Sequence, residues 1–278
     1  MFSIKSGVAN TNLADELSLN VTYAENRNNE QHPDTSINNV YGGLHTRNNT
    51  LLASVTYKET YGNLKLKSYL LAGEITETTY DTEARDYDWD GSYSDTSGNK
   101  GELENLSIFE RKDEVIRSNV SMDLAVNSTD KLSVNLSIND LNRSGHDEID
   151  LTNDSFTDTN WIRKSVLGAS YQFNSADEGL SVSSFAKQYW FDAQVNTNPA
   201  DDDLEDILEF KSNDSETGYG ATASYELSSN AQTKISYEKA YRLPEADEIL
   251  GSGKYIIPNP ELVSEKSHNL NIGLSLIN

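Results

Sequence analysis

Apolar residues recur at every second position through most of this chain. Leu132, Val134, Leu136 and Ile138, for example, are separated by serine or asparagine residues. The same alternation is found at 17–23, 120–126, 219–227 and 270–276. A period of two places one set of side chains on one face of a β-strand, whereas a helix requires a spacing of three or four. No stretch shows convincing helical spacing, so the sequence predicts an all-β fold.

The connections between these runs alternate between short and long. Short turns rich in Asn, Asp, Ser and Gly, which are typical of tight hairpins, are expected at 60–63, 127–131, 174–179 and 228–232. Long polar segments occupy 28–47, 81–111, 144–160, 196–216 and 243–266. The predicted strands are 17–27, 48–59, 64–80, 112–126, 132–143, 161–173, 180–194, 217–227, 233–242 and 268–277. This order is typical of an antiparallel transmembrane β-barrel with short periplasmic turns and long extracellular loops.

The distribution of charge supports the same architecture. The 278 residues include 22 Lys+Arg and 45 Asp+Glu, which gives a net charge of −23. Within the five long segments alone, acidic residues exceed basic ones by 22. The acidity therefore belongs to the loops, and it argues against nucleic acid as a partner. The absence of cysteine excludes disulfides and thiol chemistry. The mean hydropathy of −0.64 is compatible with a barrel, because only alternate strand residues face lipid.

A family motif is found near the C-terminus, in two parts separated by a loop. The first part ends a predicted strand and the second begins the next one. The matching residues are Tyr241, Arg242, Pro244 and Glu245, followed by Asn259, Pro260, Leu262, Glu265, Ser267 and Gly273. This pattern resembles the barrel signature of TonB-dependent outer-membrane receptors. The sequence departs from that signature at Val263-Ser264, where Lys-Pro is usual, and at Asn271, where Glu is frequent.

The motif residues have plausible structural roles. Pro244 cannot donate to a strand ladder and is therefore expected to end a strand. If Arg242 points into the barrel, its guanidinium is placed to form a bidentate pair with Glu265. We interpret this pair as bracing the barrel rim rather than contacting substrate, and no substrate-binding residue is predicted.

The resemblance implies an outer-membrane receptor for TonB-dependent active uptake of a scarce ligand, such as a carbohydrate, a metal complex or a siderophore-like molecule. Family members are barrels of about 22 strands that enclose a plug domain. About ten strands are expected here, so residues 1–278 are interpreted as part of the barrel domain, with the plug and the remaining strands outside this chain. The implied location is the outer membrane of a Gram-negative bacterium. The implied partners are outer-membrane lipid, the TonB complex through the plug, and a small-molecule or oligosaccharide ligand.

Catalytic chemistry has little support in the sequence, and no catalytic residue is predicted. The four histidines are scattered and form no metal-binding pair. One metal site is a hypothesis: Asp86, Asp88 and Asp90 alternate before Gly91, as in the first half of an EF-hand calcium loop, although Ser97 replaces the closing glutamate. No other cofactor is expected.

Two alternatives remain open from the sequence: a complete small outer-membrane β-barrel enzyme, and an adhesin. The enzyme would need catalytic groups at the barrel rim, for which His146 and Asp147 are the adjacent candidates. In all cases acidic loops disfavour strongly anionic ligands and tolerate neutral or cationic ones.

Overall fold

The computed structural model describes residues 1–12, 14–29, 43–88, 92–96, 98, 100–102, 106–149, 160–177, 179–197, 208–252, 256 and 258–276. Within them, eleven strands form one antiparallel sheet. These strands are β1 (Phe2–Ala9), β2 (Glu16–Asn29), β3 (His45–Tyr61), β4 (Leu64–Asp81), β7 (Ser107–Ala125), β8 (Asp130–Asp147), β9 (Asn160–Asn174), β10 (Leu180–Thr197), β11 (Leu208–Ser228), β12 (Ala231–Arg242) and β13 (Glu265–Leu276). A separate hairpin joins β5 (Arg85–Tyr87) to β6 (Tyr93–Asp95).

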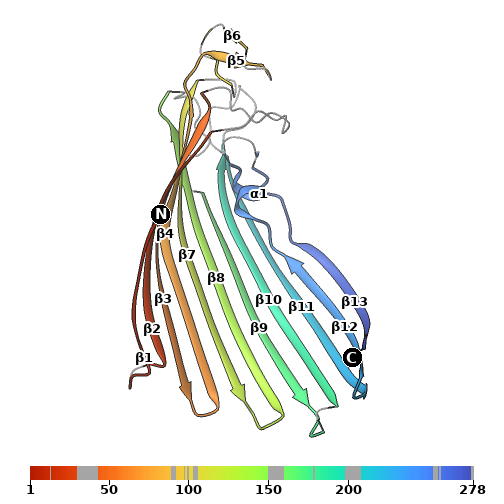
Figure 1. The fold of residues 1–278 in the computed structure, drawn as a ribbon. Helices are drawn as coiled ribbons and strands as arrows, with labels where there is room; N and C mark the ends of the chain where they lie inside the picture. Colours follow the sequence, from red (N-terminus) through yellow and green to blue (C-terminus); the bar gives the residue numbers. More distant parts are fainter. Residues whose placement is uncertain are drawn as a thin grey trace.

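Each strand of the large sheet pairs with the next strand of that sheet along the chain, so β4 pairs with β7. The sheet curves into a trough, with the short turns at one end and the β5–β6 hairpin beyond the other (Figure 1). The four predicted short turns all join paired strands, and Gly62 adopts the positive φ of 59° that a tight turn between β3 and β4 favours. The predicted fold class, a partial antiparallel transmembrane β-barrel, is confirmed.

The convex face of the sheet carries the alternating apolar residues. Directly opposed residues of antiparallel strands share a face, so Leu136 of β8 lies beside Val120 of β7 and Leu167 of β9. Leu136 and Leu167 are 36% and 41% exposed. The same face carries large exposed side chains on other strands, including Ile4, Leu19, Val55, Leu70, Ile116, Tyr219, Ile235 and Ile272. An apolar face this extensive requires an apolar surrounding, which lipid supplies.

The concave face is polar over its lower part, near the short turns. Ser133 of β8 lies between Asp123 of β7 and Ser170 of β9, and its hydroxyl donates to the Asp123 carboxylate over 2.5 Å. Lys65 and Lys67 of β4 occupy the same face. This alternation of a polar interior with an apolar exterior is that of a membrane barrel wall.

Two predictions about element boundaries are wrong. The sequence interpretation began the sheet at residue 17, whereas β1 already pairs with β2 from Phe2 to Ala9. The strands also extend into the segments that were predicted to be long loops. For example, β11 begins at Leu208, nine positions before the predicted start at residue 217. Residues 208–216 of β11 are mostly polar, so the period-two signal disappears there although the backbone pairing with β10 continues.

The helical content is small. The described helix α1 (Ala246–Leu250) lies between β12 and β13, where a loop was predicted. No helix in the described part of the chain is long and apolar enough to cross a membrane.

Hydrogen bonds from backbone amides to polar side chains of low exposure link the described ends of the long connections to the strand ends. Glu102 accepts hydrogen bonds from the backbone amides of Gly43 and Leu44 over 3.0 and 3.1 Å, and Asp81, 1% exposed, accepts from the Glu102 amide over 3.1 Å. Burial raises the pKa of the Glu102 carboxyl, although the two amides oppose this effect. These contacts join the connection after β2 to the connection after β4 and so organise the mouth of the trough.

Candidate functional site

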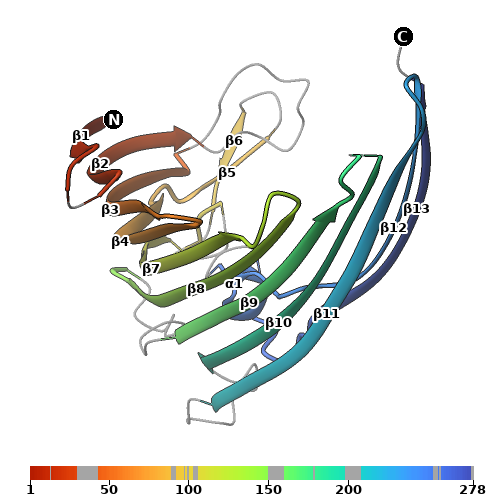
Figure 2. The same ribbon diagram turned by 90° about the horizontal axis from the view of Figure 1, so that it is seen from below.

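Helix α1 packs against the concave face of the sheet near its upper end. Ile249 and Leu250 are both 0% exposed and contact a cluster that includes Ile162 of β9 and Phe191 of β10. Seen from below, the helix lies within the curve of the sheet (Figure 2). We call residues 243–264, which connect β12 to β13 and include this helix, the strap. Its apolar contacts bring the family motif into the interior of the barrel.

A buried arginine anchors the strap to the wall. The Arg143 side chain, 3% exposed, donates from Nε and Nη2 to the two carboxylate oxygens of Asp113 over 2.7 and 2.8 Å. Its Nη1 donates to Asp247 of α1 over 2.6 Å and to the carbonyl oxygen of Gly251. A single guanidinium therefore joins strands β7 and β8 to both ends of the helix. Such bidentate, charge-assisted contacts fix orientation as well as adding binding energy.

Two further cations of the inner wall reach the strap. Nζ of Lys164, on β9, donates to Oε2 of Glu245 over 2.7 Å. Nη1 of Arg111, on β7, lies 3.9 Å from Oδ1 of Asp247. The acidic residues at the start of α1 thus face basic residues of the wall, which explains why an acidic segment folds inward.

The two halves of the family motif meet at the base of the strap. Arg242 and Glu265 are directly opposed in the β12–β13 ladder, and the guanidinium makes a bidentate contact to the carboxylate over 3.0 and 2.9 Å. Arg242 also contacts both carboxylate oxygens of Glu248, over 3.2 and 2.9 Å. Because Glu248 accepts from the Glu245 amide over 2.7 Å as well, this contact fixes the first turn of α1. These contacts hold the end of β12, the start of β13 and the first turn of α1 together.

The other motif residues shape the strap. Pro244 is among the most buried side chains and lies two positions after Arg242, the last residue of β12. The amide of Asn259 donates to the Glu248 carbonyl over 3.2 Å, and the Leu262 amide returns to the Asn259 carbonyl over 3.3 Å. Gly251 ends the helix with a φ of 74°, a conformation that favours glycine.

The remaining motif residues make fewer contacts with the rest of the structure. Leu262 packs against the buried cluster, and the ring of Tyr241 lies 5.9 Å from that of Tyr189. Ser267 is within 3.5 Å of the Ala240 carbonyl oxygen, whereas a Cβ added to Gly273 would meet nothing within 4 Å. The described contacts give no packing reason for a glycine at position 273.

The Arg242 contact has a testable pH dependence. The hydrogen bonds from Arg242, followed by the one from the Glu245 amide, hold the pKa of Glu248 below its ordinary value of 4.5. The docked strap therefore prefers the ionised carboxylate, so its stability is present above pH 4.5 and is lost as pH falls through the lowered pKa. We expect hydrogen exchange at 245–251, corrected for intrinsic rates, to accelerate on acidification below pH 4.5.

Two variants separate this effect from general acid unfolding. Glu248→Gln should remove most of the pH dependence in that segment, because it abolishes the titrating group. Glu261→Gln is the control, since Glu261 is exposed and forms no ion pair within the described residues. An unaltered profile in Glu248→Gln would contradict the assignment.

Most of the proposed calcium half-loop lies outside the described residues. Asp90 and Gly91 lie outside them, as do Ser97 and the side chain of Asp86. Asp88 is described and accepts a hydrogen bond from the Ser92 hydroxyl over 3.3 Å. Among described positions, no group of three or more His, Asp or Glu side chains has a metal-binding arrangement. The calcium site remains a hypothesis.

The adjacent pair His146 and Asp147 does not form a combined site. They are consecutive residues of β8 and so point to opposite faces of the sheet. Asp147 is 5% exposed and accepts from the Ser107 hydroxyl and from the amides of Ile108 and Ile149. Through these contacts Asp147 joins the start of β7 to the residues that follow β8.

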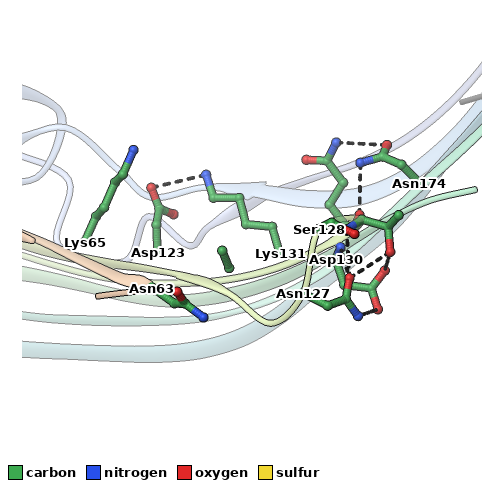
Figure 3. Close-up of a pocket in the computed structure, with 11 residues that line it drawn as sticks. Asn63, Lys65, Asp123, Asn127, Ser128, Asp130, Lys131 and Asn174 are labelled. Carbon is green, nitrogen blue, oxygen red and sulfur yellow. Dashed lines mark hydrogen bonds and ion pairs between the residues drawn. The ribbon is translucent and has the colours of Figure 1, made fainter. Parts of the chain in front are cut away.

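A hollow lies at the end of the wall opposite helix α1, beside the short turns (Figure 3). It has a volume of about 340 Å³ and is lined by turn residues of β7–β8 together with Lys65, Asp123 and Lys131. Lys131 pairs with Asp123 over 3.2 Å, and Asn127 accepts from the amides of Thr129 and Asp130. Because these contacts are within the turn or between neighbouring strands, we interpret this hollow as structural.

Comparison with known proteins agrees with this architecture. Residues 5–278 match the family described as "TonB dependent receptor-like, beta-barrel". The chain belongs to this family. TonB-dependent receptor barrels of this kind are located in the outer membrane of Gram-negative bacteria. No curated protein sequence matches this receptor barrel significantly.

Solved structures with the same fold are TonB-dependent receptors of low sequence identity. The FrpB iron transporter of Neisseria meningitidis is 11% identical, with a TM-score of 0.65 over 99% of this chain and 42% of its own. The hemophore receptor HasR of Serratia marcescens, solved with its hemophore and heme, is 11% identical, with a TM-score of 0.62 over 98% and 41%. The siderophore receptor PiuA of Acinetobacter baumannii is 10% identical, with a TM-score of 0.59 over 93% and 44%. This receptor barrel therefore spans less than half the length of each.

Several residues of the receptor barrel's inner site escaped the sequence interpretation. Arg143, Asp113 and Lys164 lie on different strands. Only the strand register shows that Asp113 lies opposite Arg143, and that Lys164 lies opposite Asn139 on the same face. A weak signal was available, because each occupies an inward position near the upper end of its strand. The sequence does not show that the strap docks against these three residues, so it gives no reason to distinguish them from other polar residues of the wall.

Proposed function

We propose that this chain is part of an outer-membrane receptor that binds a scarce ligand at its extracellular loops and imports it with energy from the TonB complex. The observation that carries the proposal is the match of residues 5–278 to the receptor-barrel family. The sheet that these residues form is curved, and its edge strands, β1 and β13, each have one neighbour among the described strands. We further propose that other strands complete the barrel beside these edges, and that a plug domain occupies the concave side and contacts TonB. Unpaired strand edges inside a bilayer are costly, which supports completion by further strands.

The proposed ligand is a metal complex, heme or siderophore of low negative charge, with an oligosaccharide as the next candidate. The named functions of the three structural neighbours favour iron, heme or siderophore ligands. The acidic loops favour a ligand that is neutral or carries cationic groups, because a multiply charged anion would be repelled. No covalent chemistry is required, since capture and release are binding steps.

The proposal is tested by uptake in cells. A strain lacking the intact receptor is complemented with it and supplied separately with labelled ferric siderophore, heme and oligosaccharide. We expect accumulation of one ligand class above the uncomplemented strain, and loss of that accumulation when TonB is deleted. Uptake that persists without TonB, or equal uptake with and without the receptor for every class, would overturn it.

A further inference from the structure

A groove opens on the convex, lipid-facing side of the sheet, at the upper edge of its apolar band. Its volume is about 430 Å³, within the range of small-molecule sites. Strands β3, β4, β7 and β8 line this outer groove, with β1 and β2 to one side and β9–β13 to the other. Neither a plug on the concave side nor strands added beside β1 or β13 would cover it. The outer groove is therefore a property of this part of the wall itself.

The lower half of the outer groove is apolar and is hollowed by small residues. Ala53 of β3 lies directly opposite Ala72 of β4, which in turn lies opposite Ile116 of β7. Leu51, the next outward residue above Ala53, and Ile116 are 54% and 51% exposed, so larger side chains flank the two methyl groups. A hollow of this shape in a face surrounded by hydrocarbon is suited to an apolar chain, because an empty void forfeits dispersion contacts.

The upper half of the outer groove lies where the hydrocarbon ends. On β4 the outward residues are mostly apolar from Leu64 to Ala72, a run of nine positions, close to the roughly 9–11 residues with which a strand crosses a membrane. The next outward residue is Glu74, and its row continues with Glu114 of β7 and Asn142 of β8. This row lies on the side away from the short turns, and therefore at the headgroup level of the extracellular leaflet.

The headgroup end of the outer groove is acidic. Nζ of Lys112 contacts carboxylate oxygens of Glu74 and Glu114, over 2.8 and 3.2 Å. Asp140, which borders the groove, is bound by Nε of Arg163 over 2.5 Å. Both cations are thus already paired, and three carboxylates face two positive charges. This excess repels a phosphate group, whereas uncharged hydroxyl groups can donate to the carboxylates.

We propose that the outer groove binds a glycolipid of the extracellular leaflet. One acyl chain occupies the hollow over Ala53 and Ala72, and the hydroxyl groups of an uncharged sugar bind Glu114 and Asn142. The Glu114 side chain is 58% exposed and so keeps acceptor capacity beside its contact to Lys112. The Asn142 amide can both donate and accept, which suits a sugar hydroxyl. The site is continuous with the lipid-facing surface, and it is independent of the imported ligand and of TonB.

The test is photo-crosslinking of the intact receptor in phosphatidylcholine vesicles, with labelled peptides mapped by mass spectrometry. Three probes share one acyl chain that carries a diazirine, and they differ in the head, which is glucosyl, phosphate or phosphocholine. We expect the glucosyl probe to label 51–53, 72–74 and 114–116 roughly fivefold more than the phosphate probe, the effect of about one net hydrogen bond. Equal or stronger labelling by either other head, or labelling spread evenly over the outer face, would overturn the proposal.

Variants separate the two halves of the outer groove, with folding of each checked by heat modifiability. Ala72→Phe fills the hollow and should lower labelling of these segments to the level of the remaining outer face. Glu114→Leu should keep the labelling but abolish the preference for the glucosyl head over phosphate. Ala223→Phe is the matched control, since Ala223 lies opposite Ile235 on the same face but outside the groove. Unchanged labelling in Ala72→Phe, an equal loss in Ala223→Phe, or a preserved preference in Glu114→Leu would overturn the site.

Discussion

Arg143→Met is expected to destabilise the receptor by about 3–5 kcal/mol and to release the strap from the inner wall. Arg143 is 3% exposed, and its loss leaves the buried carboxylate of Asp113 without its bidentate partner. It also removes the contacts to Asp247 and to the Gly251 carbonyl that fix α1. The check is urea unfolding of the intact receptor in lipid vesicles, combined with limited proteolysis of residues 243–264.

Arg163→Met provides a matched control for this experiment. Arg163 also pairs with an aspartate on the neighbouring strand, Asp140, but its side chain is 57% exposed on the outer face. An exposed pair contributes about 0–1 kcal/mol, so this variant should change the unfolding free energy little. The double variant Asp113→Leu with Arg143→Met should recover much of the loss, because it removes both charges. Equal effects of the two single arginine variants would contradict the anchoring role of Arg143.

Leu136→Arg is expected to destabilise the folded barrel by about 2–4 kcal/mol and to reduce the fraction of receptor that inserts. Leu136 lies in the middle of the apolar outer face, beside Val120 and Leu167. A guanidinium at that position must enter the hydrocarbon or distort the bilayer around it. The measurement is the fraction of heat-modifiable, folded receptor after insertion into vesicles, followed by urea unfolding.

The next residue in the chain tests whether the effect depends on the face. Ser137→Arg introduces the same side chain on the polar inner face, beside Asn119. We expect it to fold nearly as well as the wild type, because substitutions toward the lumen remain accessible to water. If Ser137→Arg were as disruptive as Leu136→Arg, the assignment of lipid and lumen faces would be wrong.

The contrast between Leu136 and Ser137 also shows why the fold could be predicted. The two faces of a membrane barrel meet different solvents, so residues such as Leu132 and Leu136 must alternate with polar ones wherever the strand crosses lipid. This requirement leaves a period-two signal in every spanning segment. Residues 208–216 of β11 are mostly polar and carry no such alternation, and there the prediction placed the start of β11 nine residues too late.

The site was accessible to sequence reasoning only in part. Arg242 and Glu265 stand in a recognisable motif, and the ladder between β12 and β13 brings them together as the motif suggests. Arg143 and Asp113 stand in no motif and are 30 positions apart in sequence. Their partnership depends on the register of two strands and on a strap that enters from more than 100 positions away.

The sequence by itself therefore determined the all-β architecture, the order of short and long connections, and the acidic character of the loop end, because each follows from local alternation and composition. The tertiary structure alone decided that the segment after β12 folds inward and that Arg143 anchors it. The physical reason is that these features depend on which side chains the strand register and the curvature of the sheet place side by side, and no local pattern records that pairing.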